Sequence, residues 1–425
     1  QNIFAGMEQT AVTDEQAKSG DATEQGESKT EKDEVEAPTD GDLKNPSKSV
    51  VNPTVPVQIS NPTKKSEGYG RSYIAYTVTS THDGKKVDVF RRYSDFVWLR
   101  QALEKNFPGC IVPPLPEKAV IGRFQGEFVS QRMRGLERFT TRVMNHDRMK
   151  KDPTVIRFLR EQQLPQRNTI KSGTQAKKAF SMLSGIGSAM LNPFASEPTE
   201  GVETKEDKNC EEIESDAKKL HKILAALHAA SSGQSKAEKD VTKTWLEMGH
   251  YLTELGRFEV DSSEEHFGGI LAQIGKCCDR MSVCSAQCVD HSVLHLVEPL
   301  KDHVLLVESV STMMANRKKA LENLHIAQKD QSKKKAALKN LEGKGSKLAD
   351  AKKAEQDSTK LVEERQNALD EMTKSVIEEI ANFRREKKKD FKRMFEGFVK
   401  MRIEQAKRQQ EAWESVLGDM QLESL

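Results

Sequence analysis

From about residue 205 to its end, the sequence has the periodicity of long α-helices, and Pro299 is the single proline in that stretch. We predict three helices, over roughly 205–258, 264–340 and 347–420, with a bend in the second at the proline. Helices of this length need partners for their apolar stripes, so the sequence predicts a bundle or coiled coil. The apolar seam of the third helix consists of Leu369, Met372, Val376, Ile380, Phe383, Phe391, Met394, Phe398 and Ile403.

Residues 54–165 follow a different pattern, that of a small α+β domain. Ser72–Thr79 alternates like a strand, Lys86–Phe90 is its expected antiparallel partner, and Asp83-Gly84 supplies the turn between them. A segment containing Pro113, Pro114 and Pro116 cannot be helical and favours an extended conformation.

Three helices are expected in the rest of this domain. Ser94 is the expected N-cap of the first helix. The last helix is capped by Asp152, begins at Pro153 and ends near Arg160. The expected buried positions are Phe96, Leu99 and Leu103 in the first helix, and Phe128, Leu136, Phe139 and Val143 in the second.

The net charge of +2 conceals an uneven distribution along the chain. Residues 1–50 contain 5 basic and 12 acidic residues, residues 51–195 contain 24 and 11, and residues 196–425 contain 38 and 42. The basic middle block favours phosphate groups, on a membrane surface or on nucleic acid. Nucleic acid is the weaker alternative because no aromatic-bearing sheet or known reading motif accompanies the charge, and we expect no nucleic-acid partner.

Two further segments flank the basic domain. Residues 1–53 are polar and acidic, and we expect a disordered tail. Residues 166–204 are expected to be a linker that contains an amphipathic helix at 175–191. Its apolar side consists of Phe180, Leu183, Ile186, Met190 and Leu191. We predict that this helix inserts into a lipid interface; packing on the helical bundle is the alternative.

Lysines gather at the expected corner between the second and third long helices. The cluster consists of Lys333, Lys334, Lys335, Lys339, Lys344 and Lys347. Each exposed lysine contributes about 1 kcal/mol near an anionic membrane, so the cluster acts only collectively. We predict a membrane-binding tip rather than a merely solvated corner.

Two motifs in the basic domain are suited to holding phosphate. In RRYSDF (91–96), Arg92 offers a planar fork to phosphate oxygens, and Tyr93 can support a sugar-like ring. In PPLPEK (113–118), the prolines fix the position of Lys118, and Arg132 can close the pocket from the following helix. The alternatives are a solvated strand end for the arginines and a ligand of SH3 domains for the prolines.

These motifs identify a family. RRYSDF, VPPLPEK (112–118) and FVSQRMRGLERF (128–139) resemble, in order and spacing, the PX (phox homology) domain. Glu298-Pro299-Leu300 and Lys389-Asp390-Phe391-Lys392 are similar to sorting nexins that carry a BAR domain. The resemblance is to a PX–BAR sorting nexin of the retromer-associated type. It implies an α+β PX domain, with a small antiparallel sheet plus helices, over 54–165, and an all-α BAR domain of three long helices forming an elongated dimer over 205–425.

The resemblance also implies roles for individual residues toward phosphatidylinositol 3-phosphate, with the 3,5-bisphosphate left open. Arg92 would hold the 3-phosphate, Tyr93 would pack on the inositol ring, and Ser94 would add a hydroxyl group. Lys118 would contact the 1-phosphate, and Arg132 the 4- and 5-hydroxyls. Every one of these positions has the expected residue type.

The implied function is curvature sensing and tubulation in retromer-linked cargo sorting, at the cytosolic face of early or recycling endosomes. The dimer is expected to be homotypic or mixed with another PX–BAR sorting nexin. Some relatives bind retromer through Asp-Leu-Phe or Asp-Ile-Phe; the nearest match here, Asn2-Ile3-Phe4, lacks the aspartate. The alternative is a cytosolic coiled-coil adaptor whose PX-like domain serves protein contacts.

No catalytic constellation appears in the sequence, and we expect no enzymatic activity, cofactor or metal. Cys277, Cys284 and Cys288 share one helical face, but zinc sites usually take paired cysteines from loops. Buried core thiols are therefore the favoured interpretation of these cysteines.

Overall fold

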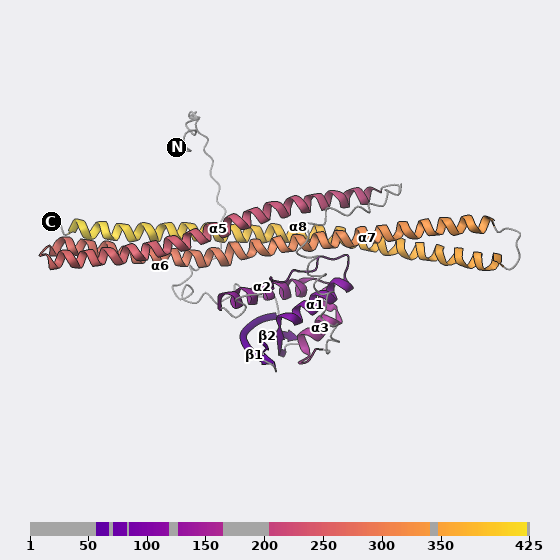
Figure 1. Ribbon diagram of the computed structural model, residues 1–425, viewed down its shortest axis with the longest axis horizontal. Coiled ribbons are helices and arrows are strands. Elements are labelled where there is room, and N and C mark those ends of the chain that lie inside the picture. The colour runs from indigo at the N-terminus through magenta and orange to yellow at the C-terminus, as the bar shows by residue number, and fades with distance from the viewer. Residues whose placement is uncertain are drawn as a thin grey trace, which may run out of the picture. The chain divides into compact units, whose positions relative to one another are not determined.

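The computed structural model describes residues 57–67, 71–82, 85–118, 126–164, 204–340 and 347–422 (Figure 1). Residues 1–53, most of the 166–204 linker with the 175–191 helix, and Lys344 lie outside the described residues. None of the described helices combines the length and the low polarity needed to span a bilayer. The described part contains a sheet with helices followed by long helices, which confirms the predicted fold class.

Three antiparallel strands form the sheet, in the order β1-β2-β3. They are β1 (Val57–Glu67), β2 (Arg71–His82) and β3 (Lys85–Arg92). The sequence did not indicate β1, because its polar run lacks alternation. Its pairing with β2 shifts between Ser60 and Thr63, and Asn61 at that point has a φ of 49°. Asparagine tolerates this left-handed backbone, so the strand continues across a bulge.

Three α-helices and one 3₁₀ turn cover the sheet. They are α1 (Tyr93–Asn106), α2 (Gly126–Asn145), η2 (Met149–Lys151) and α3 (Pro153–Arg160). Phe96 of α1 lies at the centre of the core, edge-on to Phe139 of α2 and Phe158 of α3. The predicted cap of α3 is confirmed, because the Asp152 side chain accepts a hydrogen bond from Thr154 N–H at 2.7 Å.

The predicted N-cap of α1 was wrong. Arg92 occupies the cap position and Ser94 lies within the helix. The cause is Asp95, whose side chain accepts a hydrogen bond from the backbone N–H of Arg92 at 2.9 Å. An acidic side chain at this position satisfies one of the unpaired donors at a helix start, so the helix begins before the serine.

Long helices make up the rest of the described chain: α5 (Lys205–Asp261), α6 (Glu265–Ser292), α7 (Glu298–Asn340) and α8 (Lys347–Leu422). A short π-helical segment, η3 (Val293–Val297), joins α6 to α7 just before Pro299. Proline lacks an N–H and its ring crowds the preceding turn, so a wider turn accommodates it. The interruption therefore lies next to the predicted bend.

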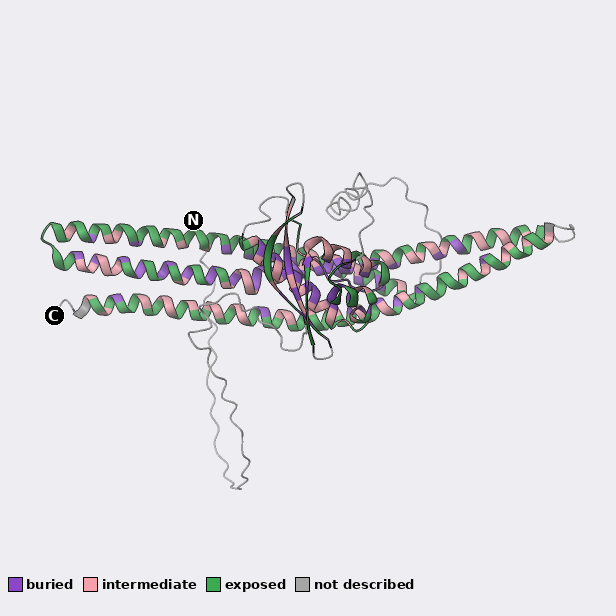
Figure 2. Cartoon of the chain, turned by 90° about the horizontal axis from the view of Figure 1, so that it is seen from below, coloured by how far each residue is buried: buried purple, intermediate pink, exposed green. Residues whose placement is uncertain are grey.

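Residues 52–425 hold together as one unit, and the long helices lie side by side within it (Figure 1). Buried residues concentrate in the middle of the helices, whereas the outer parts are mostly exposed (Figure 2). The central cluster joins Leu224 of α5, Leu300 and Val310 of α7, and Val376 of α8. These residues show that the apolar stripes of different helices pack on one another, as bundle formation requires.

Glycines bring α5 and α6 unusually close together. A Cβ atom added to Gly268 would lie 2.5 Å from the carbonyl oxygen of Gly256, and one added to Gly275 would lie 2.9 Å from that of Gly249. No larger side chain fits at such separations. The α5–α6 hairpin is thus held by backbone contact at two levels.

Candidate functional site

The predicted phosphate-binding residues come from three elements of the small domain. Arg92, Tyr93 and Ser94 lie where β3 passes into α1, Lys118 lies at the end of the proline segment, and Arg132 lies on α2. The structure brings Tyr93 and Arg132 together with the proline segment. The Tyr93 hydroxyl donates a hydrogen bond to the Pro116 carbonyl oxygen at 2.6 Å.

Arg132 forms the inner wall of this site. Its guanidinium carbon lies 4.6 Å from the ring centre of Tyr93 and 4.3 Å from that of Phe128, and the residue is only 7% exposed. Nη2 donates a long hydrogen bond of 3.4 Å to the Glu117 carbonyl oxygen, and Nε has no acceptor among the described residues. A buried donor left unsatisfied costs about 1–3 kcal/mol, which an incoming oxygen-rich ligand would recover.

Tyr93 remains an uncharged hydroxyl in this environment. Burial raises the pKa of Tyr93, and the Arg132 guanidinium opposes that rise only in part. Burial likewise raises the pKa of the neighbouring Tyr76. Both phenols stay protonated at neutral pH, so neither would repel an anionic ligand.

The outer residues of the site are more accessible. Arg92 stacks over the Tyr73 ring at 5.3 Å, and its Nε lies 3.8 Å from Asp95. Ser94 is half-buried and Lys118 is exposed. The arrangement therefore has a buried cation against aromatic rings, with more accessible cationic side chains on the neighbouring elements.

Arg91, next to Arg92, belongs to the fold and not to the site. It is 1% exposed, and its guanidinium donates to the carbonyl oxygens of Phe158 at 2.7 and 3.0 Å and of Glu161. These carbonyls lie at the end of α3, where a cation is favoured. Successive residues of a strand face opposite sides, which separates the two arginines.

Three other arginines of α2 bind the long helices, a feature that the sequence reasoning missed. Arg134, Arg138 and Arg142 recur every four residues, and they contact the carboxylates of Glu298 and Asp302 on α7. Burial alone would raise the pKa of Asp302, but Arg142 and Arg138 hold it below its usual value. The four-residue spacing of arginines was the available signal, and nothing local identified their partners.

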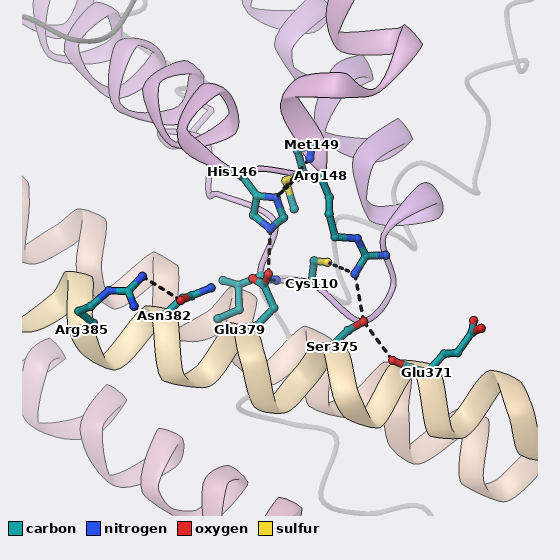
Figure 3. A network of polar contacts seen from close by, with 10 residues as sticks. Cys110, His146, Arg148, Met149, Glu371, Ser375, Glu379, Asn382 and Arg385 are labelled. Atoms are coloured by element: carbon teal, nitrogen blue, oxygen red, sulfur yellow. Dashed lines mark hydrogen bonds and ion pairs between the residues drawn. The ribbon is translucent and has the colours of Figure 1, made fainter.

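A second set of contacts joins the small domain to α8 (Figure 3). The Glu379 carboxylate accepts hydrogen bonds from the Ile111 backbone N–H at 3.1 Å and from His146 Nε2 at 2.8 Å. Arg148 donates to Ser375 Oγ at 3.0 Å. The Ile111 side chain belongs to the apolar cluster of the bundle. The two parts of the chain are thus joined by both polar and apolar contacts.

This second joint contains the ligand types of a metal site, because atoms of Cys110, His146 and Glu379 lie within 4.8 Å of one another. His146 Nδ1 accepts hydrogen bonds from two backbone N–H groups, at 3.2 Å each, so Nε2 carries the proton that Glu379 accepts. Burial raises the pKa of Cys110 to about 11. A metal would have to displace both protons, so the geometry favours a hydrogen-bonded joint.

Cys277, Cys284 and Cys288 of α6 lie against α8, and Cys278 lies beside Gly249 of α5. Cys277, Cys278 and Cys288 are buried and Cys284 is partly buried. Cys288 Sγ lies 2.8 Å from Gln405 Oε1, and burial raises the pKa of this thiol. These thiols occupy positions in the helix–helix contact, as the sequence favoured.

The predicted basic tip falls at the end of α7 and the start of α8. Lys333, Lys335 and Lys339 are exposed, whereas Lys334 is half-buried and forms an ion pair with Asp330 at 2.7 Å. Lys347 is the first residue of α8.

Comparisons with known proteins agree on two regions. The PX domain family matches residues 79–162, and the family described as "Vps5 C terminal like" matches residues 188–419, more than half of the chain. The chain is 25% identical over 393 residues to "Sorting nexin 1" of Arabidopsis thaliana, covering 90% of this chain and 96% of that protein. It is 26% identical over 389 residues to human "Sorting nexin-1", covering 85% and 71%.

A solved structure has the same fold. "The cryo-EM structure of the SNX-BAR Mvp1 tetramer" aligns with a TM-score of 0.65 at 19% identity, over 85% of this chain and 99% of that chain. The likeness extends across both the sheet-containing domain and the long helices.

Proposed function

Since this chain belongs to the PX–BAR sorting nexins, which act in endosomal trafficking, we propose that a phosphoinositide recruits it to the membrane through the site around Arg132. The carrying observation is the buried Arg132 guanidinium, held between two aromatic rings with an unsatisfied Nε. A phosphorylated inositol ring offers the hydroxyl and phosphate oxygens that such a donor needs.

The proposed ligand is phosphatidylinositol 3-phosphate, with the 3,5-bisphosphate as a second possibility. Arg92 would hold the 3-phosphate with help from Ser94, and Tyr93 would pack on the ring. Lys118 would reach the 1-phosphate, and Arg132 the 4- and 5-hydroxyls. The exposure of Lys118 and the burial of Arg132 suit these roles, since the 1-phosphate is nearest the membrane.

Self-association is proposed for the long helices. Large apolar side chains are exposed along α5 and α8 in the single chain, among them Tyr251 at 70% and Phe258 at 64%. Contiguous exposed apolar residues usually mark an interface, because leaving them in water forgoes burial. We propose that a second copy, or another PX–BAR sorting nexin, covers them.

The remaining proposals concern the membrane. The basic tip and the apolar side of the 175–191 helix would bind and bend an anionic leaflet, and linked weak sites gain avidity. The protein would act at early or recycling endosomes, with retromer, in cargo sorting and tubulation. Sorting nexins are non-enzymatic adaptors, and we propose the same for this chain.

Vesicle flotation tests the lipid site. The intact protein is mixed with vesicles that contain or lack phosphatidylinositol 3-phosphate, and compared with Arg92→Ala. We expect the variant to lose about 10–100-fold in lipid-dependent binding, the effect of one or two charged hydrogen bonds. Arg160→Ala is the matched control, because it removes an exposed arginine of the same domain and should bind normally.

The result also separates the two functions considered. Binding that depends on the lipid and on Arg92 supports endosomal recruitment. Equal binding by the wild type and Arg92→Ala, or no lipid dependence in either, would favour the cytosolic adaptor and contradict the proposed site.

A further inference from the structure

One turn of α7 contacts both walls of the proposed phosphoinositide site. The first wall is α2, which carries Arg132, and the second is the proline segment that ends at Lys118. Glu298, Lys301 and Asp302 lie three and four residues apart and so share a face of the helix. Glu298 and Asp302 bind α2, which carries Arg132, and Lys301 binds Glu117, which precedes Lys118. A small cavity lies between these residues and the pocket wall, and both domains line it.

The first wall is held by buried ion pairs. Arg134 forms a two-pronged contact with Glu298, with Nε at 3.0 Å and Nη2 at 2.5 Å from the carboxylate oxygens. Arg142 Nη2 lies 2.5 Å from Asp302, and Arg138 reaches both carboxylates at 3.4 and 3.6 Å. The Glu298 and Asp302 side chains are only 1% and 9% exposed, whereas the arginines reach the surface at 24–30%, so buried carboxylates fix the orientation of the guanidinium groups.

The geometry of α2 transmits this hold to the pocket. Arg132 is two residues before Arg134, which places the two side chains on opposite faces of the helix. Arg132 lies against Tyr93, whereas Arg134 is fixed to α7, and the cavity beside α7 is lined by Arg132 as well. Because Arg132 is part of α2, any rotation or shift of α2 relative to α7 also displaces the Arg132 side chain.

The second wall is held at one point and packed at another. Lys301 Nζ lies 3.0 Å from Glu117 Oε2. Pro116 packs so tightly on α2 that a Cβ atom added to Gly135 would lie 2.9 Å from it. Because Pro116 also accepts the Tyr93 hydrogen bond, the proline segment, α1 and α2 form one joined wall.

We propose that this turn of α7 sets the geometry of the phosphoinositide site, so that Glu298, Lys301 and Asp302 are positioning residues for headgroup binding. Affinity for the headgroup is then coupled to the helical bundle, and headgroup binding in turn strengthens the docking of the two domains. The inference rests on the proposed function, because it concerns the same site.

Electrostatics and positioning predict opposite effects for one substitution. Glu298 places a negative charge behind a site for an anion. If charge alone mattered, Glu298→Gln would tighten binding of a phosphorylated headgroup. If Glu298 positions α2, the same change loosens the arginines and weakens binding.

The experiment is isothermal titration of the full chain with soluble dibutanoyl phosphatidylinositol 3-phosphate, which removes avidity and membrane effects. We expect Glu298→Gln to bind about tenfold more weakly than wild type. Unchanged or tighter binding would overturn the proposal. If the wild type does not bind the probe, the proposed function fails instead, and the two failures are thereby distinguished.

A charge exchange at the Lys301–Glu117 pair tests the same proposal independently of Glu298→Gln, whose buried position makes it prone to unfold the domain. Lys301→Glu and Glu117→Lys should each weaken binding about threefold, as expected of a partly exposed pair, and the double variant should recover wild-type affinity. Lys319→Glu, an exposed lysine of α7 far from the site, should have no effect. Tighter binding by Glu117→Lys would indicate a through-space charge effect, and weakening without recovery in the double variant would show that the Lys301–Glu117 contact does not position the site; either result contradicts the proposal.

Discussion

The two neighbouring arginines of RRYSDF have separate tasks, and their environments show why. Arg91 is enclosed and saturates the carbonyls at the end of α3, whereas Arg92 caps α1 at the rim of the site. From the sequence, Arg92, Tyr93, Lys118 and Arg132 were available as candidates through residue type and spacing, and Ser94 through the family resemblance. Which arginine was structural depended on α3, which lies about 67 residues away along the chain.

Arg91→Ala should destabilise the small domain by about 2–4 kcal/mol, since it leaves several buried carbonyls unpaired. Hydrogen exchange of α3 amides measures this, and we expect faster exchange there than in wild type. Arg92→Ala is the control and should leave α3 protected. Wild-type protection in Arg91→Ala would show that the carbonyls find other donors.

His303 predicts an acid-sensitive bundle. It is 3% exposed, its ring stacks edge-on to Phe391, and its Nδ1 has no partner among the described residues. Burial, with Arg142 next in importance, lowers its pKa from 6.5 to about 4, against opposing effects of Asp302 and Asp390. Lys387 also disfavours the charged form.

The sign follows from this depression. Above pH 6.5 His303 is unprotonated in both the folded and the unfolded chain. Below pH 6.5 His303 binds a proton in the unfolded chain but not in the folded chain. The free energy of unfolding therefore falls with decreasing pH until the pH passes about 4. Between pH 7 and pH 5 this costs about 2 kcal/mol. Urea unfolding followed by circular dichroism should show it, and His303→Gln should lose that part of the pH dependence. An identical dependence in both proteins would contradict the assignment.

At the scale of elements, the long helices were the most predictable part of the fold. Their apolar repeats extend over many turns, so the expected ranges 205–258 and 347–420 differ from α5 and α8 by a few residues at most, and the expected helix 264–340 corresponds to α6, η3 and α7 together. β1 was missed because it is polar and bulged, and the start of α1 was displaced by Asp95. Local side-chain contacts such as the Asp95 cap decide where a helix or strand begins and ends, whereas the apolar periodicity decides whether it forms at all.

The α5–α6 contact offers a test with adjacent glycines. Gly268→Ala should destabilise the hairpin by about 1–3 kcal/mol, because the new methyl group would overlap the backbone of α5. Gly269→Ala is the control: a Cβ atom there meets nothing within 4 Å, and alanine favours a helix by about 1 kcal/mol. Thermal unfolding of the two variants should shift in opposite directions. If the unfolding midpoints of both variants shifted in the same direction, the close approach of α5 and α6 at Gly268 would contribute nothing to stability.

At the scale of the whole molecule, the contacts between domains were beyond sequence reasoning. Arg134 and Glu298 are 164 positions apart, and Ile111 and Glu379 are 268 apart. Each residue on its own reads as an ordinary charged or apolar residue of its own element. Only the assembled fold shows that α2 places Arg132 against Tyr93 while its other arginines bind α7.

Self-association is the prediction at this scale. Tyr251→Glu and Phe258→Glu together place charges on an exposed apolar stripe of α5, and burial of two charges at an interface is costly. Sedimentation velocity should show a dimeric wild type and a monomeric double variant at micromolar concentration. Lys239→Glu, exposed elsewhere on α5, should remain dimeric. A dimeric double variant would place the interface on other helices.

The docking of α2 on one turn of α7 has a consequence for how such chains can change in length. A single residue inserted between Ser292 and Glu298 would turn Glu298 and Asp302 by about 100° around the helix axis, away from the arginines of α2. Insertions and deletions are therefore excluded from this stretch unless they come in whole turns. The far ends of α7 and α8 have no such restriction, so matched additions there would lengthen the bundle while the proposed lipid site stays as it is.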